Sequence, residues 1–145
     1  MFLYSKLKDY NKTIHIAFIG CGKFVSMFLA QLNNLVKIEV DIIIDLDIKR
    51  AKYNYINSGL KKTTFEKINF SKNVNDILEN NNIDIVIEAT GNPKVGILNA
   101  IKVINSKKNI IMVNVEADVV SGKYLSDLAK KNGVIYSMAY GDQPA

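Results

Sequence analysis

The sequence predicts an α/β fold, a doubly wound parallel sheet of about six strands in the order 3-2-1-4-5-6. Short apolar runs alternate with amphipathic helical patterns along most of the chain, as expected when helices cover both faces of a parallel sheet. The run 42–44 is wholly apolar, which is typical of a strand buried on both faces. A Gly-x-Gly sequence at 20–22 lies between the first expected strand and the first expected helix.

The length and composition indicate one globular domain. The chain has 145 residues, of which 48% are apolar, enough to bury a sizeable core. No apolar run approaches the roughly 20 residues that span a bilayer, and the N-terminus lacks the ordered regions of a signal peptide. We therefore expect no membrane partner. We divide the chain into a polar lead-in over 1–12 and one domain over 13–145.

The charge and the cysteine content exclude several classes of function. The net charge is +5, but the lysines are dispersed instead of gathered on one face with aromatic residues, so we expect no nucleic-acid partner. Cys21 is the only cysteine, which excludes an intramolecular disulfide and favours a reducing, cytoplasmic location. One cysteine and one histidine, His15, do not supply a zinc set, so we expect no metal.

The first βα unit and the following strand are well patterned. Residues 13–19 form the first expected strand because they are mostly apolar and β-branched. Residues 22–33 form a helix because their large apolar side chains recur at the spacing of one helix face, and Asn33 ends it. The second strand, 37–44, ends in the apolar run described above.

The middle of the chain is patterned less clearly. A helix over 47–57 ends before Gly59, where a left-handed cap costs glycine little. A short third strand lies within 61–70, at either 63–66 or 68–70. Residues 71–82 are expected to form a capped short helix.

The last third of the chain returns to clear alternation. The strand 83–89 is followed by a helix over 93–106, with proline at its first position. A strand at 109–113 and a helix over 121–132, ending before a glycine, follow. The last expected strand, 134–137, leads into a segment at the edge where parallel sheets bind ligands. We therefore expect the chain to be the cofactor-binding part of a longer protein.

The glycine pair predicts a site for the pyrophosphate of a dinucleotide. Gly20 allows a sharp turn off the strand, and Gly22 has no Cβ, so the backbone can approach a phosphate closely. The N–H groups and the dipole at the start of the next helix then hold the negative charge. At the third position of the fingerprint, where glycine or alanine is usual, the chain has Val25.

The other residues of this loop are candidate cofactor contacts as well. Lys23 and Phe24 open the helix, and Lys23 faces either phosphate or solvent. Cys21 has two interpretations. The exposed N–H groups of the loop can lower the pKa of its thiol, or Cys21 is only a small side chain that fills the loop.

The end of the second strand carries two opposing signals for cofactor choice. Asp45 can accept hydrogen bonds from the adenosine ribose, which favours NAD, or it can cap the following helix. Asp47 can take the cap and leave the ribose to Asp45. Arg50 can instead pair with a 2′-phosphate, which favours NADP. The choice between NAD and NADP stays open.

Two further strand ends supply candidate residues. Thr90 and Gly91 follow the fourth strand and are expected to line the groove, although a plain strand–turn–helix junction has the same pattern. Asn114 and Glu116 follow the fifth strand, where the nicotinamide lies in doubly wound folds, so they can orient the ring or a substrate. Glu116 is the only candidate catalytic residue. Asp118 can cap a helix.

Three segments together resemble a known family. Residues 87–93, 112–119 and 136–145 resemble the homoserine-dehydrogenase-like oxidoreductases that carry a C-terminal SAF domain, a group that includes deoxyxylulose-phosphate-reductoisomerase-like enzymes. The resemblance implies an NAD(P)-binding Rossmann domain. It also implies a catalytic and dimerisation domain elsewhere in a longer, homo-oligomeric protein that acts on a small substrate.

The resemblance also implies roles for particular residues. Gly20, Gly22, Thr90 and Gly91 would bind the cofactor, and Glu116 with the loop 140–143 would face the nicotinamide and the substrate. No proton-transfer residue is carried over. The intact protein would pass a hydride between the nicotinamide and a carbonyl or alcohol. The alternative is a module that senses NAD(P) or binds another nucleotide without catalysis.

Overall fold

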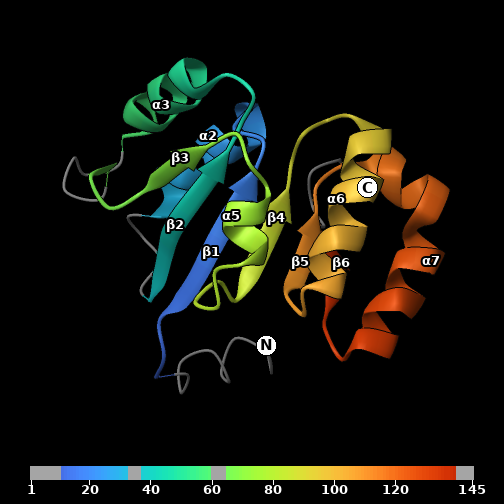
Figure 1. Cartoon of the computed structure of the whole chain (residues 1–145). Coiled ribbons are helices and arrows are strands. Elements are labelled where there is room, and N and C mark those ends of the chain that lie inside the picture. The colour runs from blue at the N-terminus through green and yellow to red at the C-terminus, as the bar shows by residue number, and fades with distance from the viewer. Residues whose placement is uncertain (1–10, 33–36, 60–64, 140–145) are drawn as a thin grey trace.

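The computed structural model describes residues 11–32, 37–59 and 65–139. Within them, six strands form one parallel sheet in the order β3-β2-β1-β4-β5-β6 (Figure 1). The predicted fold class, strand number and strand order are therefore confirmed. The strands are β1 (Ile14–Ile19), β2 (Ile38–Ile44), β3 (Asn69–Ser71), β4 (Ile85–Glu88), β5 (Asn109–Met112) and β6 (Tyr136–Met138).

Helices cover both faces of the sheet, and each face has its own apolar core. The alternation along β1 shows this division, since Phe18 packs into the core under α2 and α3 whereas Ile19 packs into the core with α6 and α7. None of the described helices is long and apolar enough to cross a membrane. The helices are α2 (Lys23–Gln31), α3 (Ile48–Asn57), α5 (Asn75–Leu78), α6 (Pro93–Asn105) and α7 (Val115–Asn132).

The structure decides between the two positions of the third strand and differs from other predicted elements, among them the last strand, which begins at Tyr136 instead of 134. The third strand overlaps the second of its two expected positions, 68–70, and the other position begins outside the described residues. The helix expected over 71–82 is a single turn, α5. Helix α7 begins at Val115 instead of 121, because Asn114 caps it there. Most of the lead-in, residues 1–10, and the loop 140–143 lie outside the described residues.

The sheet has its topological switch point at β1. This strand pairs with β2 on one side and with β4 on the other, so the chain leaves it in opposite directions. The carboxyl ends of the three strands are level, since Ile19 is in register with both Ile44 and Glu88. Open parallel sheets bind ligands just beyond strand ends that are arranged in this way.

Candidate functional site

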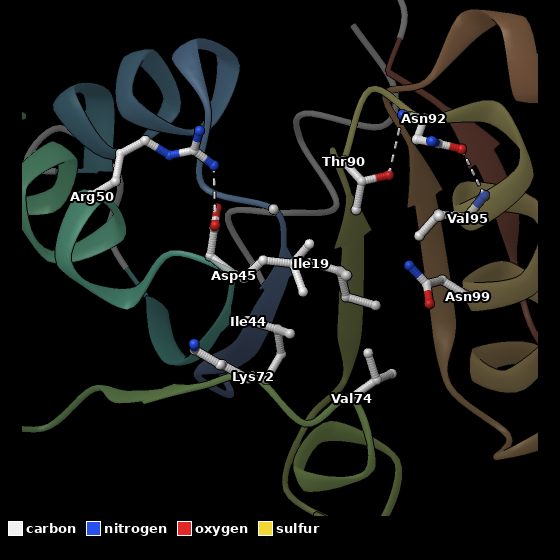
Figure 2. A pocket seen from close by; sticks show the side chains of 12 residues that line it. Ile19, Ile44, Asp45, Arg50, Lys72, Val74, Thr90, Asn92, Val95 and Asn99 are labelled. Atoms are coloured by element: carbon white, nitrogen blue, oxygen red, sulfur yellow. Dashed lines mark hydrogen bonds and ion pairs between the residues drawn. The ribbon is translucent and has the colours of Figure 1, made fainter.

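A cavity of about 350 Å³ opens beyond the carboxyl ends of β1, β2 and β4. Small-molecule sites in proteins have volumes of about 300–1,000 Å³, so this cavity can enclose a group the size of a nucleoside. Figure 2 shows its polar side chains in two groups. Asp45, Arg50 and Lys72 lie along one side, and Thr90, Asn92 and Asn99 lie along the other. The remaining lining residues are Ile19, Gly20, Ile44, Leu46, Val74 and Val95.

Gly20 makes the sharp turn that the sequence predicts. Its φ is +92°, a left-handed conformation that side chains disfavour. Its N–H donates to the carbonyl oxygen of Ile44 over 2.7 Å, which joins the ends of β1 and β2. A Cβ at this position would lie 2.6 Å from the carbonyl oxygen of Ala89. Both the backbone conformation and the close approach of β4 therefore require glycine here.

The N-terminus of α2 has the geometry of an anion site. Gly22 is the N-cap residue, and its position leaves the helix without a side-chain cap from the part of the chain that the structure describes. A Cβ built on Gly22 would have no atom of the described residues within 4 Å, so there is room for another group at this position. The N–H groups of a first turn have no partner within their helix, and the helix dipole adds positive potential there. Lys23, the first helical residue, is exposed.

The loop residues lie next to the cavity along the chain. Of the five that the sequence predicts as cofactor contacts, Gly20 lines the cavity, and the rest, 21–24, continue from it into α2. Val25, which stands where the fingerprint expects a small residue, is fully buried in the core.

Cys21 has a structural environment. Its side chain is fully buried, and its thiol donates to the carbonyl oxygen of Ala51 over 3.7 Å. Burial, with a further contribution from the Asp45 carboxylate, raises the pKa of the thiol to about 11. The interpretation of a loop field that lowers this pKa is therefore wrong, because the side chain points into the core. Cys21 is the small side chain that fills the loop.

Asp45 joins the loop to the start of α3. Its Oδ2 accepts from the backbone N–H of Cys21 over 2.8 Å. Its Oδ1 accepts from the N–H of Asp47 over 2.9 Å and from Nη2 of Arg50 over 3.1 Å. The residue is only 6% exposed. Asp47 caps α3 by accepting from the N–H of Arg50 over 3.0 Å, as one of the two interpretations of the sequence proposes.

A buried carboxylate that the sequence did not identify lies behind Thr90. Glu88 is fully buried, and its Oε1 accepts from the Thr90 hydroxyl over 2.6 Å. Burial raises the pKa of this carboxyl, and the hydrogen bonds from Thr90, with a smaller effect of the nearby Asn99 amide, oppose that shift. Two buried side-chain atoms have no hydrogen-bond partner within the described part of the chain, Glu88 Oε2 and Asn114 Nδ2. A Cβ on Gly96 would lie 2.9 Å from the first and 3.3 Å from the second.

The residues predicted after β5 do not line this cavity. Asn114 is buried and caps α7, accepting from the N–H of Ala117 over 3.1 Å. Glu116 is exposed in the first turn of α7. Asp118 lies in the first turn of α7, which Asn114 caps, so its expected role as a cap is wrong; it accepts from the Tyr136 hydroxyl of β6 over 2.7 Å. Gly91 has a φ of +71° in the turn before α6 and does not line the cavity either.

Several lining residues were missed by the reading of the sequence. Asn92, Val95 and Asn99 are spaced by three and four positions, which places them on one face at the start of α6, and that spacing is a signal that the sequence contains. Lys72 and Val74 follow β3 in a stretch with little pattern, and nothing local marks them.

A second polar group lies toward the opposite ends of β1 and β2. Nδ1 of His15 is 3.0 Å from both carboxylate oxygens of Asp41. That hydrogen bond raises the pKa of His15. Ligand atoms of His15, Glu39 and Asp41 lie within 4.8 Å of one another. These side chains are intermediate or exposed, and the ion pair accounts for the approach of His15 and Asp41.

Comparison with solved structures identifies chains of the same fold. The homoserine dehydrogenase from Thiobacillus denitrificans superposes with a TM-score of 0.75 at 18% identity, covering 88% of this chain and 29% of that one. Staphylococcus aureus homoserine dehydrogenase superposes with a TM-score of 0.67 at 22% identity, covering 90% of this chain and 33% of that one. An oxidoreductase from Bacillus cereus superposes with a TM-score of 0.71 at 25% identity, covering 87% of this chain and 34% of that one. The chain therefore spans about a third of the length of these proteins.

Sequence comparison is more specific about the family. A search of curated proteins finds no significant match. The family model described as the NAD binding domain of homoserine dehydrogenase matches residues 20–138, from the first glycine of the loop to the end of β6. Since this match covers most of the chain, the protein belongs to the family of homoserine dehydrogenase NAD-binding domains.

Proposed function

We propose that the cavity and the adjoining loop bind a nicotinamide dinucleotide, with the pyrophosphate at the N-terminus of α2 and the adenosine in the cavity. The observation that carries this proposal is the uncapped start of α2, with open space at Gly22, beside a cavity at the switch point of the sheet. The membership of an NAD-binding family supports the same cofactor.

The residues around the cavity fit this cofactor chemically. The first-turn N–H groups of α2 are donors for the pyrophosphate oxygens. The Thr90 hydroxyl gives its hydrogen to Glu88, and its oxygen accepts from the Asn92 N–H over 3.5 Å, so one lone pair remains as an acceptor for a ribose hydroxyl. Ile19, Ile44 and Val74 supply apolar surface for the base. Gly91, Asn114 and Glu116, near the ends of β4 and β5, are proposed to lie toward the nicotinamide.

The intact protein is proposed to be an NAD(P)-dependent oxidoreductase that acts on a small carbonyl or alcohol. The bound nicotinamide would supply the hydride, while this domain holds and orients the cofactor. The substrate class is that of a homoserine-dehydrogenase-like or deoxyxylulose-phosphate-reductoisomerase-like enzyme. Glu116 is the only described residue that we propose for catalysis. We also propose a homo-oligomer in the cytoplasm, where the single buried thiol stays reduced.

Titration of the chain with NADH and NADPH, followed by nicotinamide fluorescence, tests this function. We expect Gly22→Asp to weaken both by about tenfold or more, because its carboxylate occupies the phosphate position. The variant should still fold, since the space is open and aspartate is a favourable N-cap. Met27→Asp is the matched control, because it adds the same charge on α2 at a side chain that is 62% exposed. Equal affinities of the two variants would contradict the proposal.

A further inference from the structure

We infer that Glu88 is a positioning residue of the ligand site, which orients the Thr90 hydroxyl at the cavity and pairs with the Asn114 amide at the start of α7. The inference rests on the proposed function, because Thr90 and Asn114 are among the residues proposed to face the dinucleotide. Glu88 is fully buried, so it acts through these two residues and not by contact with a ligand. One carboxylate thereby holds the segments that follow β4 and β5 in a single arrangement.

The contact between Glu88 and Thr90 fixes a side chain of the cavity. Oε1 of Glu88 accepts from the Thr90 hydroxyl over 2.6 Å and from the Thr90 N–H over 3.3 Å. Thr90 lines the cavity. Because the carboxylate holds the hydroxyl hydrogen, the Thr90 oxygen can only accept from a ligand. Glu88 therefore determines that Thr90 binds a hydrogen-bond donor.

The second oxygen of Glu88 lies near a buried donor. Oε2 of Glu88 and Nδ2 of Asn114 are the two buried side-chain atoms that lack a hydrogen-bond partner among the residues that the structure describes. A Cβ on Gly96 would lie 2.9 Å from Oε2 and 3.3 Å from Nδ2, so both atoms pack against the same point of α6. Buried polar atoms without a partner are rare and costly. A hydrogen bond between this acceptor and this donor satisfies both.

The cap of α7 fixes which atom of Asn114 faces Glu88. Oδ1 of Asn114 accepts from the N–H of Ala117 over 3.1 Å, so the amide cannot be turned around without loss of the cap. The donor Nδ2 is therefore the atom left for Glu88. Gly96 provides the room. A glycine inside a helix lowers helix stability relative to alanine, and a larger residue here would occupy the place where the two side chains meet.

A carboxylate is needed at position 88 because it must accept on both sides. Thr90 donates to one oxygen, and Asn114 offers a donor to the other. Glu88→Gln leaves one acceptor and one donor, so the amide can serve only one of the two neighbours. Asn114→Asp turns that neighbour into an acceptor and keeps an oxygen for the cap of α7. Donor and acceptor can therefore be exchanged between the two positions.

This exchange tests the inference. We expect Glu88→Gln and Asn114→Asp each to lower the melting temperature by about 5–10 °C, because the first places two donors together and the second two carboxylates. The double variant restores a donor and an acceptor, so it should melt within about 3 °C of the wild type. Glu79→Gln is the matched control, since it makes the same change at an exposed residue that does not line the cavity.

Titration of the same proteins with NADH and NADPH, below their melting temperatures, measures the positioning role. We expect Glu88→Gln to weaken both cofactors by about tenfold and the double variant to bind them within about twofold of the wild type. A residue that only stabilises the fold would lower the melting temperature and leave the affinity of the folded protein unchanged. The affinity and its rescue therefore separate the two roles.

Each outcome supports or overturns the inference. It is overturned if the losses of the two single variants add in the double variant, or if Glu88→Gln binds both cofactors as tightly as the wild type. If the wild type binds neither cofactor, the proposed function fails and this inference fails with it. Binding by the wild type without rescue in the double variant overturns the inference alone.

Discussion

The backbone N–H of Cys21 donates to Asp45 Oδ2 over 2.8 Å, and this contact joins residues 24 positions apart. It links the loop that follows β1 to the end of β2. Because Asp45 also accepts from the N–H of Asp47, one carboxylate holds the phosphate loop and the start of α3 in a fixed relation. The acid at the end of the second strand thus organises the proposed pyrophosphate site.

Replacement of Asp45 tests this organising role. Asp45→Ala leaves a buried backbone N–H without its partner, so we expect the free energy of unfolding to fall by about 2–4 kcal/mol. Asp47→Ala, which removes only the exposed cap of α3, should cost about 1 kcal/mol. Urea unfolding of both variants measures the difference. A loss at Asp45 no larger than the loss at Asp47 would show that the carboxylate is dispensable to the loop.

Gly20 and Gly22 are expected to differ sharply in their tolerance of a side chain. Gly20→Ala should lower the free energy of unfolding by about 2–5 kcal/mol, since its φ is +92° and its Cβ would meet a backbone oxygen at 2.6 Å. Gly22→Ala is the control, because its Cβ has open space. Thermal unfolding of the two variants compares them. Similar melting temperatures would contradict the close approach of β4.

The thiol of Cys21 should be unreactive in the folded protein. Burial and the Asp45 carboxylate raise its pKa to about 11, so little thiolate forms near pH 8. Because the side chain is fully buried, a thiol reagent in solution also cannot reach it. Because Cys21 is the only cysteine, Ellman's reagent reports on this site alone. We expect slow reaction in buffer and rapid reaction in denaturant. Fast labelling under native conditions would place the side chain outside the core.

The His15–Asp41 pair should make stability depend on pH. The hydrogen bond to Asp41 raises the pKa of His15 above 6.5, so the folded state binds the proton more tightly than the unfolded state. The stabilisation is full below about pH 6.5 and is lost as the pH rises through the higher folded value. Proton NMR of the single histidine measures this pKa directly. Asp41→Asn should lower it, and an unchanged value would exclude the pair as the cause.

The strands and the loop could be predicted because their signals are local. An apolar run marks β2, and the two glycines of the loop are separated by a single residue. The start of α7 could not be predicted, because the apolar residues Val119 and Val120 are 79% and 74% exposed. They therefore do not follow the apolar spacing of a buried helix face, by which a helix is recognised in a sequence. Glu88 was missed because nothing local distinguishes a buried carboxylate at a strand end from an exposed one.

The cavity itself depends on contacts that lie far apart in the sequence. Asp45, Thr90 and Gly20 follow three different strands, and each was predicted from its place at a strand end. Lys72 joins the cavity only when β3 packs beside those strands, and no local pattern marks it, whereas the helical spacing of Asn92, Val95 and Asn99 shows a shared face but not that this face lines a cavity. The hydrogen bonds of Asp45 could not be predicted either, because its partners lie in the loop after β1 and at the start of α3 and are known only from the fold.

A crystal structure of the protein soaked with NADPH tests the central claim most directly. We expect the pyrophosphate at the N-terminus of α2 beside Gly22, and the adenosine in the cavity between the ends of β1, β2 and β4. Dinucleotide density at any other surface, with this cavity and the start of α2 left without it, would contradict the account.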